Sequence, residues 1–431
     1  MSRPAEPPPT DASTRSSAPA ASTSGPRFHG WRIVAYSALA MAMTAPGQTT
    51  GVSVFIDPLI ADLGVSRTQV STAYLTGTLV GACAMPLVGR AIDRYGPRRV
   101  IGAVGAAFGA ILLALSFVTG LVGLTAGFIG IRMAGQGALS LVATTTVAYW
   151  FDRRRGLALG ITSAVGTAGI SLAPVLFERL VADHGWRQAW AIEGIAVWAI
   201  VIPLALFGIR NRPADLGQHV DGITPQDDSA ADAPLTGWTL RQALRTSAFW
   251  AVAACLSASS MLTTGLNFHQ IGLLGERGLT PAEAAANFLP QTAAALLATL
   301  AAGALIDRLP PKAVLIAAMT VLACATLAAR FIHPGWTAIA YGILLGASNG
   351  LLRAVESATL PRYFGTAHLG AIRGSAHTVT IAASAFGPLA VSIGHDLTGH
   401  YGTALLVLAV LPAVAALAAA AARTPHSKSE H

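Results

Sequence analysis

The sequence is poor in charged residues. Asp, Glu, Lys and Arg make up only 11% of the 431 residues, and hydrophobic residues make up 53%, whereas about a quarter of an average soluble protein is charged. The mean hydropathy is correspondingly high, at +0.57. This composition excludes an ordinary soluble globular protein and indicates a chain that crosses a membrane several times.

The sequence also lacks the usual signs of covalent or metal chemistry. Its three cysteines, Cys83, Cys255 and Cys324, lie inside apolar runs, so it contains neither a disulfide framework nor the ligand spacing of a zinc site. It has no recognisable phosphate-binding glycine loop, catalytic triad or cluster of metal ligands. We therefore expect a protein without cofactor, metal or enzymatic activity.

Long apolar segments fill most of the chain. A helix that crosses a hydrocarbon core of about 30 Å needs about 20 apolar residues, because each residue adds about 1.5 Å. Twelve segments meet this requirement. We predict an all-α membrane protein with twelve transmembrane helices near residues 31–56, 68–91, 99–118, 122–149, 157–181, 187–209, 247–272, 282–306, 312–330, 336–362, 370–394 and 401–422.

The segments outside these helices divide the chain. Residues 1–27 are rich in Pro, Ser, Thr and Ala and have no apolar core, which predicts a disordered cytoplasmic tail. A polar stretch rich in Pro, Asp and Gly lies in the middle of the chain. We expect an N-terminal six-helix bundle at 28–210, a cytoplasmic linker at 211–245, a C-terminal bundle at 246–423 and a short cytoplasmic tail at 424–431.

Positive charge is distributed unevenly between the two sides of the predicted helices. Most of the 28 Lys and Arg residues lie on the side of the N-terminus, and short loops rich in these residues stay in the cytoplasm. Both termini are therefore predicted to be cytoplasmic, in a multi-pass protein of the inner (cytoplasmic) membrane. This bias explains the pI near 9.9 without any need for nucleic acid. The predicted outer side carries Arg67, Arg179, Arg187, Arg277 and Arg330.

The two halves of the chain repeat each other. A shift of 214 residues superposes Thr49–Gly51 on Thr263–Gly265, and the same register aligns Gly89 with Gly303 and Asp93 with Asp307. Two pseudo-symmetric bundles of the same topology are therefore expected. In transporters built in this way, the substrate site lies near the bilayer midplane between the repeats, and the repeats rock about it to give alternating access.

A loop motif occurs once in each half. It reads GRAIDRYGPRR from Gly89 to Arg99 and GALIDRLPPK from Gly303 to Lys312, and it resembles the signature loop of the major facilitator superfamily. The resemblance implies a role in closing the cytoplasmic gate, with topological anchoring as the alternative. The candidate gating residues are Gly89, Asp93, Arg94, Gly96, Arg98, Asp307 and Arg308.

Further motifs resemble one branch of this superfamily, the oxalate/formate antiporters and monocarboxylate transporters. They are GVSVFIDPL from Gly51, GVSRTQVS from Gly64, YWFDRRRGLALGI from Tyr149, HGWRQAW from His184 and GERGLTPAEAA from Gly275. The resemblance implies alternating-access transport of a small organic anion, with proton coupling or exchange. Proton-driven efflux of a drug or larger metabolite is the alternative, and a non-transporting membrane sensor represents another class. We expect a monomer.

Charged side chains inside the predicted helices are candidates for contact with the cargo, because they are costly in hydrocarbon and tend to face water or a partner. Arg132 is the first, since its planar guanidinium can bind a carboxylate through two hydrogen bonds; a structural contact to backbone carbonyls is the alternative. Arg353 and Glu356 are three residues apart on one helical face, where they either neutralise each other or form a switchable pair.

Several further residues are candidates for the predicted site. His269 and His377 can titrate near neutral pH and carry a proton, although a histidine in a membrane helix often only packs. Glu356 is a further candidate for proton coupling. Pro46 and Gly47 are expected to interrupt the first helix and free backbone carbonyls. The remaining candidate substrate contacts are His269 and the uncharged residues Tyr74, Asn267 and Gln291.

Overall fold

The computed structural model describes residues 28–222 and 237–422, apart from 307–308 and 366–367. Regular secondary structure in these ranges is helical, and Gly237 and Gly365 form an isolated β-bridge. The predicted tails at 1–27 and 424–431 lie outside the described residues, and so does the middle of the predicted linker. The all-helical fold predicted from the sequence is confirmed.

Helices of the first half pack on one another. The most extensive contacts within this half join α5 to α8, α1 to α8 and α4 to α6. The elements are α1 (Gly30–Ala42), η1 (Ala45–Gly47), α2 (Thr49–Ser53), α3 (Ile56–Leu63), α4 (Arg67–Tyr95), α5 (Pro97–Leu115), α6 (Leu121–Ile131), η2 (Arg132–Leu139), α7 (Ser140–Trp150), α8 (Arg155–Pro203) and η3 (Leu204–Gly208).

Helices of the second half form another packed group, in which α13 lies along α15, and α10 along α16. The elements are α10 (Ser247–Phe268), α11 (Gln270–Gly275), α12 (Pro281–Ala286), α13 (Phe288–Ile306), α14 (Pro311–Ala328), η6 (Ala329–Phe331), α15 (Trp336–Phe364), α16 (Leu369–Thr398), α17 (Tyr401–Leu408) and α18 (Val410–Ala421).

Ten helical segments of the described chain are long and apolar enough to cross a membrane. Two local features explain the difference from the predicted twelve. Two predicted helices are continuous in α8 and meet at Gly185, whose φ of 78° and ψ of 161° bend the chain. The first predicted helix is broken at Pro46 and Gly47, as expected, so that α1 alone has only 13 residues. The count of twelve stays a prediction.

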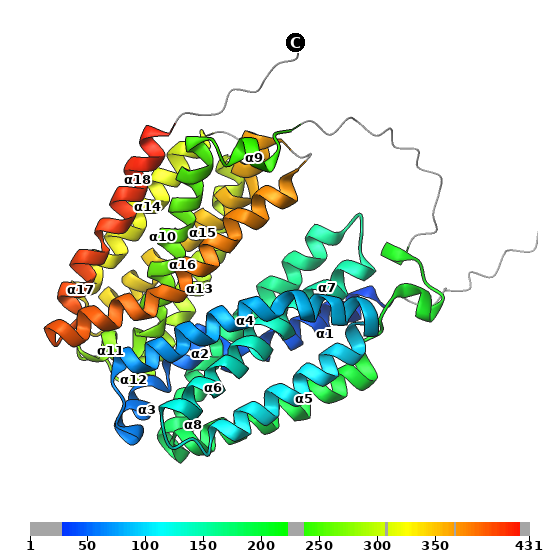
Figure 1. Ribbon diagram of the computed structural model, residues 1–431, viewed down its shortest axis with the longest axis horizontal. Coiled ribbons are helices and arrows are strands. Elements are labelled where there is room, and N and C mark those ends of the chain that lie inside the picture. The colour runs from blue at the N-terminus through cyan, green and yellow to red at the C-terminus, as the bar shows by residue number, and fades with distance from the viewer. Residues whose placement is uncertain (1–27, 223–236, 307–308, 366–367, 423–431) are drawn as a thin grey trace, which may run out of the picture.

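The two groups of helices meet at one end and diverge toward the other (Figure 1). Inter-group contacts pair α4 with α16, α2 with α10, and α8 with α12 and α13. The hydrogen bonds between α4 and α16 lie at the start of α4 and the end of α16. We call this the closed end. The opposite end, where α1 begins and α9 (Leu240–Ala243) lies, is the open end.

The described parts of the linker region are attached to the group of helices nearest in sequence. After α8, the short helices η4 (Pro213–Leu216) and η5 (Val220–Gly222) lead to Asp221, whose carboxylate accepts hydrogen bonds of 2.7–3.3 Å from the backbone N–H groups of residues 152–154. Slight burial favours the neutral acid, but these bonds outweigh it and lower the pKa of Asp221. On the other side, the Trp238 N–H donates to the Phe364 carbonyl at 2.8 Å.

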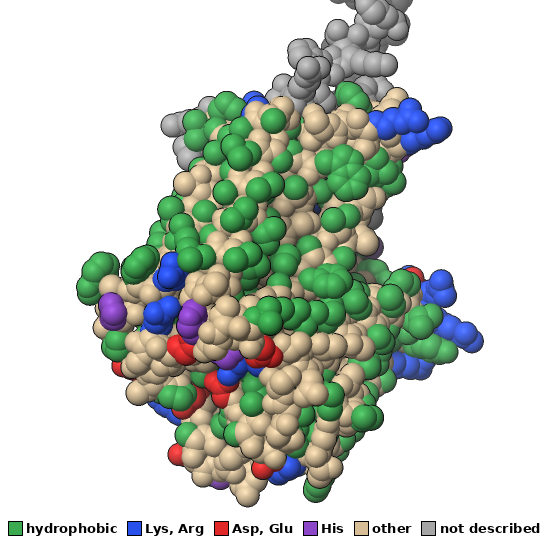
Figure 2. Space-filling view, turned by 60° about the vertical axis from the view of Figure 1, so that its left-hand side comes forward, with side chains coloured by type: hydrophobic (Ala, Val, Ile, Leu, Met, Phe, Trp, Pro, Cys, Tyr) green, Lys and Arg blue, Asp and Glu red, His purple; other side chains and the backbone are tan. Residues whose placement is uncertain are grey.

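The surface matches a protein that crosses a bilayer. Figure 2 shows apolar side chains over much of the visible flank; most acidic and histidine side chains gather at the lower left, and further Lys and Arg side chains stand at the right and top of the view. The charged residues of the closed end include Asp57, Arg67, Glu276 and Asp396. Large apolar side chains such as Phe117, Phe207 and Leu397 are more than 70% exposed, which is costly in water and favourable in lipid.

Candidate functional site

Arg132 begins η2, a π-helical turn between α6 and α7, and its side chain is buried with only 4% of its surface exposed. The guanidinium donates to the Thr78 hydroxyl at 3.0 Å through Nε and to the Gly47 carbonyl at 3.1 Å through Nη1. This carbonyl is available because the first helix is broken here: the turn at Ala45–Gly47 ends at Gln48, whose extended backbone separates it from α2. The described residues supply no carboxylate to Arg132.

Tyr74 of α4 covers the guanidinium. Its ring lies 4.4 Å from the Cζ atom of Arg132, a cation–π contact, and its hydroxyl hydrogen-bonds the Thr49 hydroxyl at 2.6 Å. On its other side the ring packs against Phe268 of α10, with 4.5 Å between centroids. Tyr74 therefore links the Arg132 cluster of the first group to the second group of helices.

Two of the predicted polar residues form a pair in the second group. Gln291 of α13 donates through Nε2 to the Oδ1 atom of Asn267 on α10, at 2.9 Å. The Oε1 atom of Gln291 is buried and has no hydrogen-bond partner in the structure. Asn267 precedes Phe268, the residue that touches Tyr74, so this pair lies close to the contact between the two groups.

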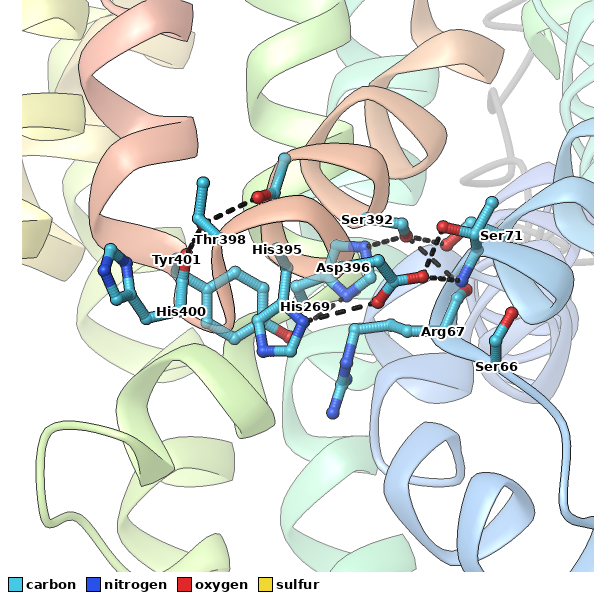
Figure 3. Close-up of polar contacts among 12 residues, drawn as sticks. Ser66, Arg67, Ser71, His269, Ser392, His395, Asp396, Thr398, His400 and Tyr401 are labelled. Atoms are coloured by element: carbon cyan, nitrogen blue, oxygen red, sulfur yellow. Dashed lines mark hydrogen bonds and ion pairs between the residues drawn. The ribbon is translucent and has the colours of Figure 1, made fainter.

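His269 connects the two groups more directly (Figure 3). Its Nε2 atom lies 3.0 Å from the Pro388 carbonyl and 3.0 Å from the Ser392 hydroxyl of α16, and the Ser392 hydroxyl hydrogen-bonds Ser71 of α4. A carbonyl only accepts, so Nε2 carries a hydrogen. The other ring nitrogen, Nδ1, lies 3.4 Å from the Tyr401 hydroxyl.

Charged residues surround this histidine at the closed end. Asp396 of α16 accepts two hydrogen bonds from Thr68 of α4, and His395 lies 3.0 Å from a Glu276 carboxylate oxygen. The Arg67 guanidinium bonds Asp57 at 2.7 Å and stands 5.7 Å from the Tyr401 ring. The Thr68–Asp396 bonds hold α4 against α16, and the Arg67–Tyr401 contact holds it against α17, so these two contacts close one end of the interface between the two groups.

Other predicted residues lie apart from these contacts. Arg353 and Glu356 are both on α15, and within the described structure they form no ion pair with each other, so the self-paired arrangement does not occur in this conformation. His377 of α16 is exposed. The structure therefore brings together Arg132 with Tyr74 and Asn267 with Gln291, and it places His269 in the closed end.

The first copy of the loop motif lies at the open end. Asp93 accepts a hydrogen bond of 3.2 Å from the Tyr149 hydroxyl, and Arg98 donates to the Ala205 and Leu206 carbonyls at 3.2 and 2.6 Å. Gly96 has a φ of 79° and faces Asn211, which would lie 2.7 Å from an added Cβ atom, so only glycine fits there. Gly89 has open space around it and Arg94 stacks on Tyr95.

The second copy of the motif is only partly described. Asp307 and Arg308 lie outside the described residues. Lys312, the repeat equivalent of Arg98, donates to the Ala422 carbonyl at 3.2 Å. Arg98 and Lys312 therefore make the same type of contact in the two halves, because each binds a carbonyl at the end of the last helix of its own group.

The sequence analysis missed most residues of the closed end. Three segments that carry them were quoted only as marks of family resemblance: GVSVFIDPL from Gly51, GVSRTQVS from Gly64 and GERGLTPAEAA from Gly275. Thr68 and Ser71 are more than 300 positions from their partners on α16, and Glu276 is 119 positions from His395, so spacing gives no signal. The missed residues are Asp57, Arg67, Thr68, Ser71, Glu276, Ser392, His395, Asp396 and Tyr401.

Comparison with known proteins agrees with this arrangement. The family model described as Major Facilitator Superfamily matches residues 37–289 and 270–431. The chain belongs to the Major Facilitator Superfamily. It is therefore a multi-pass membrane transporter that moves a small-molecule substrate across a lipid bilayer, and the resemblance stated from the loop motifs is confirmed.

Relatives in this superfamily differ in what they are named for. Monocarboxylate transporter 13 of Bos taurus is 26% identical over 389 residues, which cover 88% of this chain and 85% of the relative. A triacylglyceride transporter of Mycolicibacterium smegmatis is 34% identical over 183 residues, 40% of this chain and 32% of the relative. An uncharacterised MFS-type transporter of Bacillus subtilis, YcxA, is 26% identical over 37% of the chain and 39% of its own length.

Solved structures share the fold at low identity. A bacterial homologue of the human lysosomal transporter Spinster, in an inward-facing and occupied conformation, has a TM-score of 0.70 and 15% identity, and the match covers 94% of this chain and all of that one (100%). The nucleoside transporter NupG gives a TM-score of 0.68 and 15% identity over 91% and 99% of the two chains. These matches confirm the predicted major facilitator fold.

Proposed function

We propose that this member of the superfamily moves a small organic anion, such as a monocarboxylate, by alternating access between two six-helix bundles. The observation that carries the proposal is the buried guanidinium of Arg132, which has hydroxyl, carbonyl and aromatic contacts but no carboxylate partner among the described residues. Placing a cation inside a membrane helix costs about 2.5–3.5 kcal/mol on insertion scales. Because no described carboxylate neutralises this charge, it can attract an anionic cargo.

The neighbours of Arg132 suit reversible binding of an anion. Neutral acceptors hold the guanidinium in place without cancelling its charge, and the planar group can exchange a carbonyl for a bidentate carboxylate. Tyr74 covers the guanidinium and touches Phe268 of the other group. Opening the closed end would separate this pair and give a ligand access to Arg132 from that side.

The conformation itself supports alternating access. The two groups are held together at the closed end and diverge at the open end. With the termini in the cytoplasm, as the distribution of Lys and Arg indicates, the structure is the inward-facing state. Asp93, Arg98 and the remainder of the loop motif then lie at the cytoplasmic side, where they would form contacts when that side closes.

Coupling to protons is the second part of the proposal. In His269 the Nε2 atom already bears a hydrogen, so Nδ1, next to the Tyr401 hydroxyl, is the atom that would accept a proton. The imidazole also contacts Ser392, which bonds Ser71 of the other group. Uptake of a proton at this position would act directly on the contact that closes the outer side.

Uptake into proteoliposomes tests the anion. Labelled lactate or formate is the probe, and Arg132→Gln should lower the rate at least tenfold, because a neutral amide cannot replace the charge-assisted bonds. The matched control is Arg179→Gln, which removes an exposed arginine from the middle of α8, near the bend at Gly185 on the predicted outer side. Undiminished anion uptake by Arg132→Gln would remove Arg132 from the site.

A pH gradient tests the coupling in the same vesicles. Proton coupling predicts accumulation of the anion against its gradient when the pH differs across the membrane, and loss of this accumulation in His269→Gln. Exchange predicts instead that uptake depends on an anion loaded on the other side and is indifferent to the pH gradient. Glu356 and His377 remain the other candidate proton carriers, and their variants are compared in this assay.

The alternative cargo is a drug or larger metabolite that is exported. The 34% identity to a triacylglyceride transporter over part of the chain favours this alternative. A thermal-shift screen of purified protein separates the two, because a cargo that binds only the folded state stabilises it. Stabilisation by hydrophobic drugs and not by carboxylates would favour export. We further propose that the protein is a monomer of the cytoplasmic membrane with both termini inside.

A further inference from the structure

A groove runs between α5 and the end of α8 at the open end, on the outside of the first group of helices. Its volume is about 640 Å³. The floor consists of Gly102, Ala103 and Ala106 of α5, and Ile202 and Leu206 form the facing wall. The groove belongs to neither the Arg132 cluster nor the closed end.

The mouth of the groove is positively charged. Arg98 and Arg99 line it, and none of its lining residues is acidic. The Arg98 guanidinium is already bound to the carbonyls of Ala205 and Leu206. The Arg99 side chain is exposed and has no hydrogen bond or ion pair to a described residue. A cationic group with no partner among the described residues therefore stands where an apolar groove begins.

The groove lies at the depth where a bilayer changes from headgroups to acyl chains. Arg99 is in the first turn of α5, a helix long and apolar enough to cross a membrane. Ala106, seven residues further on, lies about 10 Å deeper at 1.5 Å per residue. Leu206, which lines the groove, and Phe207, the next residue, are 50% and 76% exposed, as expected of side chains that face lipid.

We propose that this groove binds one anionic phospholipid, with the phosphate at Arg99 and an acyl chain along the α5 floor. Charge complementarity favours an anionic headgroup over a zwitterionic one, since basic pockets between transmembrane helices on the cytoplasmic side attract anionic lipid. The bound lipid would join α5 to the end of α8. The inference stands independently of the nature of the cargo.

Native mass spectrometry tests the proposal on the purified full-length protein. The probes are dioleoyl phosphatidylglycerol and dioleoyl phosphatidylcholine, added in detergent over a concentration series. We expect phosphatidylglycerol to bind at least tenfold more tightly to the wild-type protein. Arg99→Gln should remove most of this preference, and Ala103→Leu, which fills the floor and leaves the charges in place, should weaken binding of the same lipid.

Arg245→Gln is the matched control, because Arg245 is also exposed at the open end but lies outside the groove. It should leave the affinity for phosphatidylglycerol unchanged. Equal binding of the two lipids by the wild-type protein would overturn the proposal. So would an equal loss in Arg99→Gln and Arg245→Gln, which would indicate non-specific surface charge, or full binding by Ala103→Leu, which would show that no acyl chain occupies the groove.

Discussion

Asp396, near the end of α16, caps α4 of the other group of helices. Its Oδ2 atom accepts the backbone N–H of Thr68 at 3.2 Å and the Thr68 hydroxyl at 2.6 Å. Thr68 is the second residue of α4, where N–H groups have no partner within the helix. A carboxylate at this position also interacts favourably with the helix dipole. Asp396 can cap α4 only while α16 packs against α4 at the closed end.

Removing the charge of Asp396 should therefore favour opening of this end. The Asp396→Asn variant loses the charge–dipole attraction and weakens both hydrogen bonds, a change of about 1 kcal/mol. The population that is open at this end should rise about fivefold. Double electron–electron resonance measures this population. Spin labels at positions 61 and 397, in a cysteine-free background, give the distribution of distances across the closed end.

Asp62 provides the control for this measurement. Its carboxylate binds Arg187 at 2.7 Å and is exposed to a similar degree, but both residues belong to the first group. Asp62→Asn should leave the distance distribution between the labels unchanged. If it shifts the distribution as much as Asp396→Asn does, the effect comes from general surface charge and the capping interpretation fails.

The fold was predictable because its causes are local or repeated. Apolar length identifies the spanning helices, and the shift of 214 residues relates Arg98 to Lys312, which make equivalent contacts in the structure. The helix count was harder, since it depends on backbone geometry at Gly185 and Pro46. Pro46 and Gly47 predicted an interruption of the first helix, but no pattern in the sequence indicates that α8 runs on through Gly185.

The site was predictable only in part. Arg132 and Tyr74 were predicted because they are polar residues inside apolar segments, and the structure places them in contact. The closed end could not be found in this way, because Asp396 and Thr68 are ordinary residues at helix ends. Their importance arises from the packing of α16 against α4, which joins positions 328 residues apart.

Arg98 and Lys312 should stabilise the two groups to different extents. Arg98 binds two carbonyls and Lys312 binds one. We expect Arg98→Ala to lower the free energy of unfolding by about 1–2 kcal/mol, as for partly exposed bonds to a charged donor, and Lys312→Ala to have a smaller effect. Thermal unfolding in detergent measures both. Arg90→Ala, an exposed arginine on α4, is the control and should unfold like the wild type.

Two glycines on α16 should respond oppositely to the same substitution. A Cβ atom at Gly387 would collide with the Met261 carbonyl oxygen where α10 and α16 cross, whereas one at Gly374 would meet nothing within 4 Å. Gly387→Ala should destabilise the protein by about 1–3 kcal/mol. Gly374→Ala should stabilise it by about 0.5–1 kcal/mol, because alanine favours the helix. Thermal unfolding of the pair decides; destabilisation by both would contradict the crossing geometry.

Docking of the linker through Asp221 should depend on pH. Its carboxylate accepts three backbone N–H groups at residues 152–154, and its pKa is lower in the folded state than the usual value of about 3.9. The stabilisation is therefore fully present above about pH 4 and is lost as the pH falls through the lower folded pKa. Hydrogen exchange of these three amides, corrected for intrinsic rates, should show protection that disappears in acid.

The Asp221→Asn variant isolates the charge in this experiment. Asp221 has a φ of 60°, a conformation that asparagine also tolerates, so the backbone can keep its path. The amide side chain cannot ionise. Protection of residues 152–154 should then be weaker at neutral pH and independent of pH in the acid range. An acid-induced loss of protection as steep as in the wild type would assign the titration to another group.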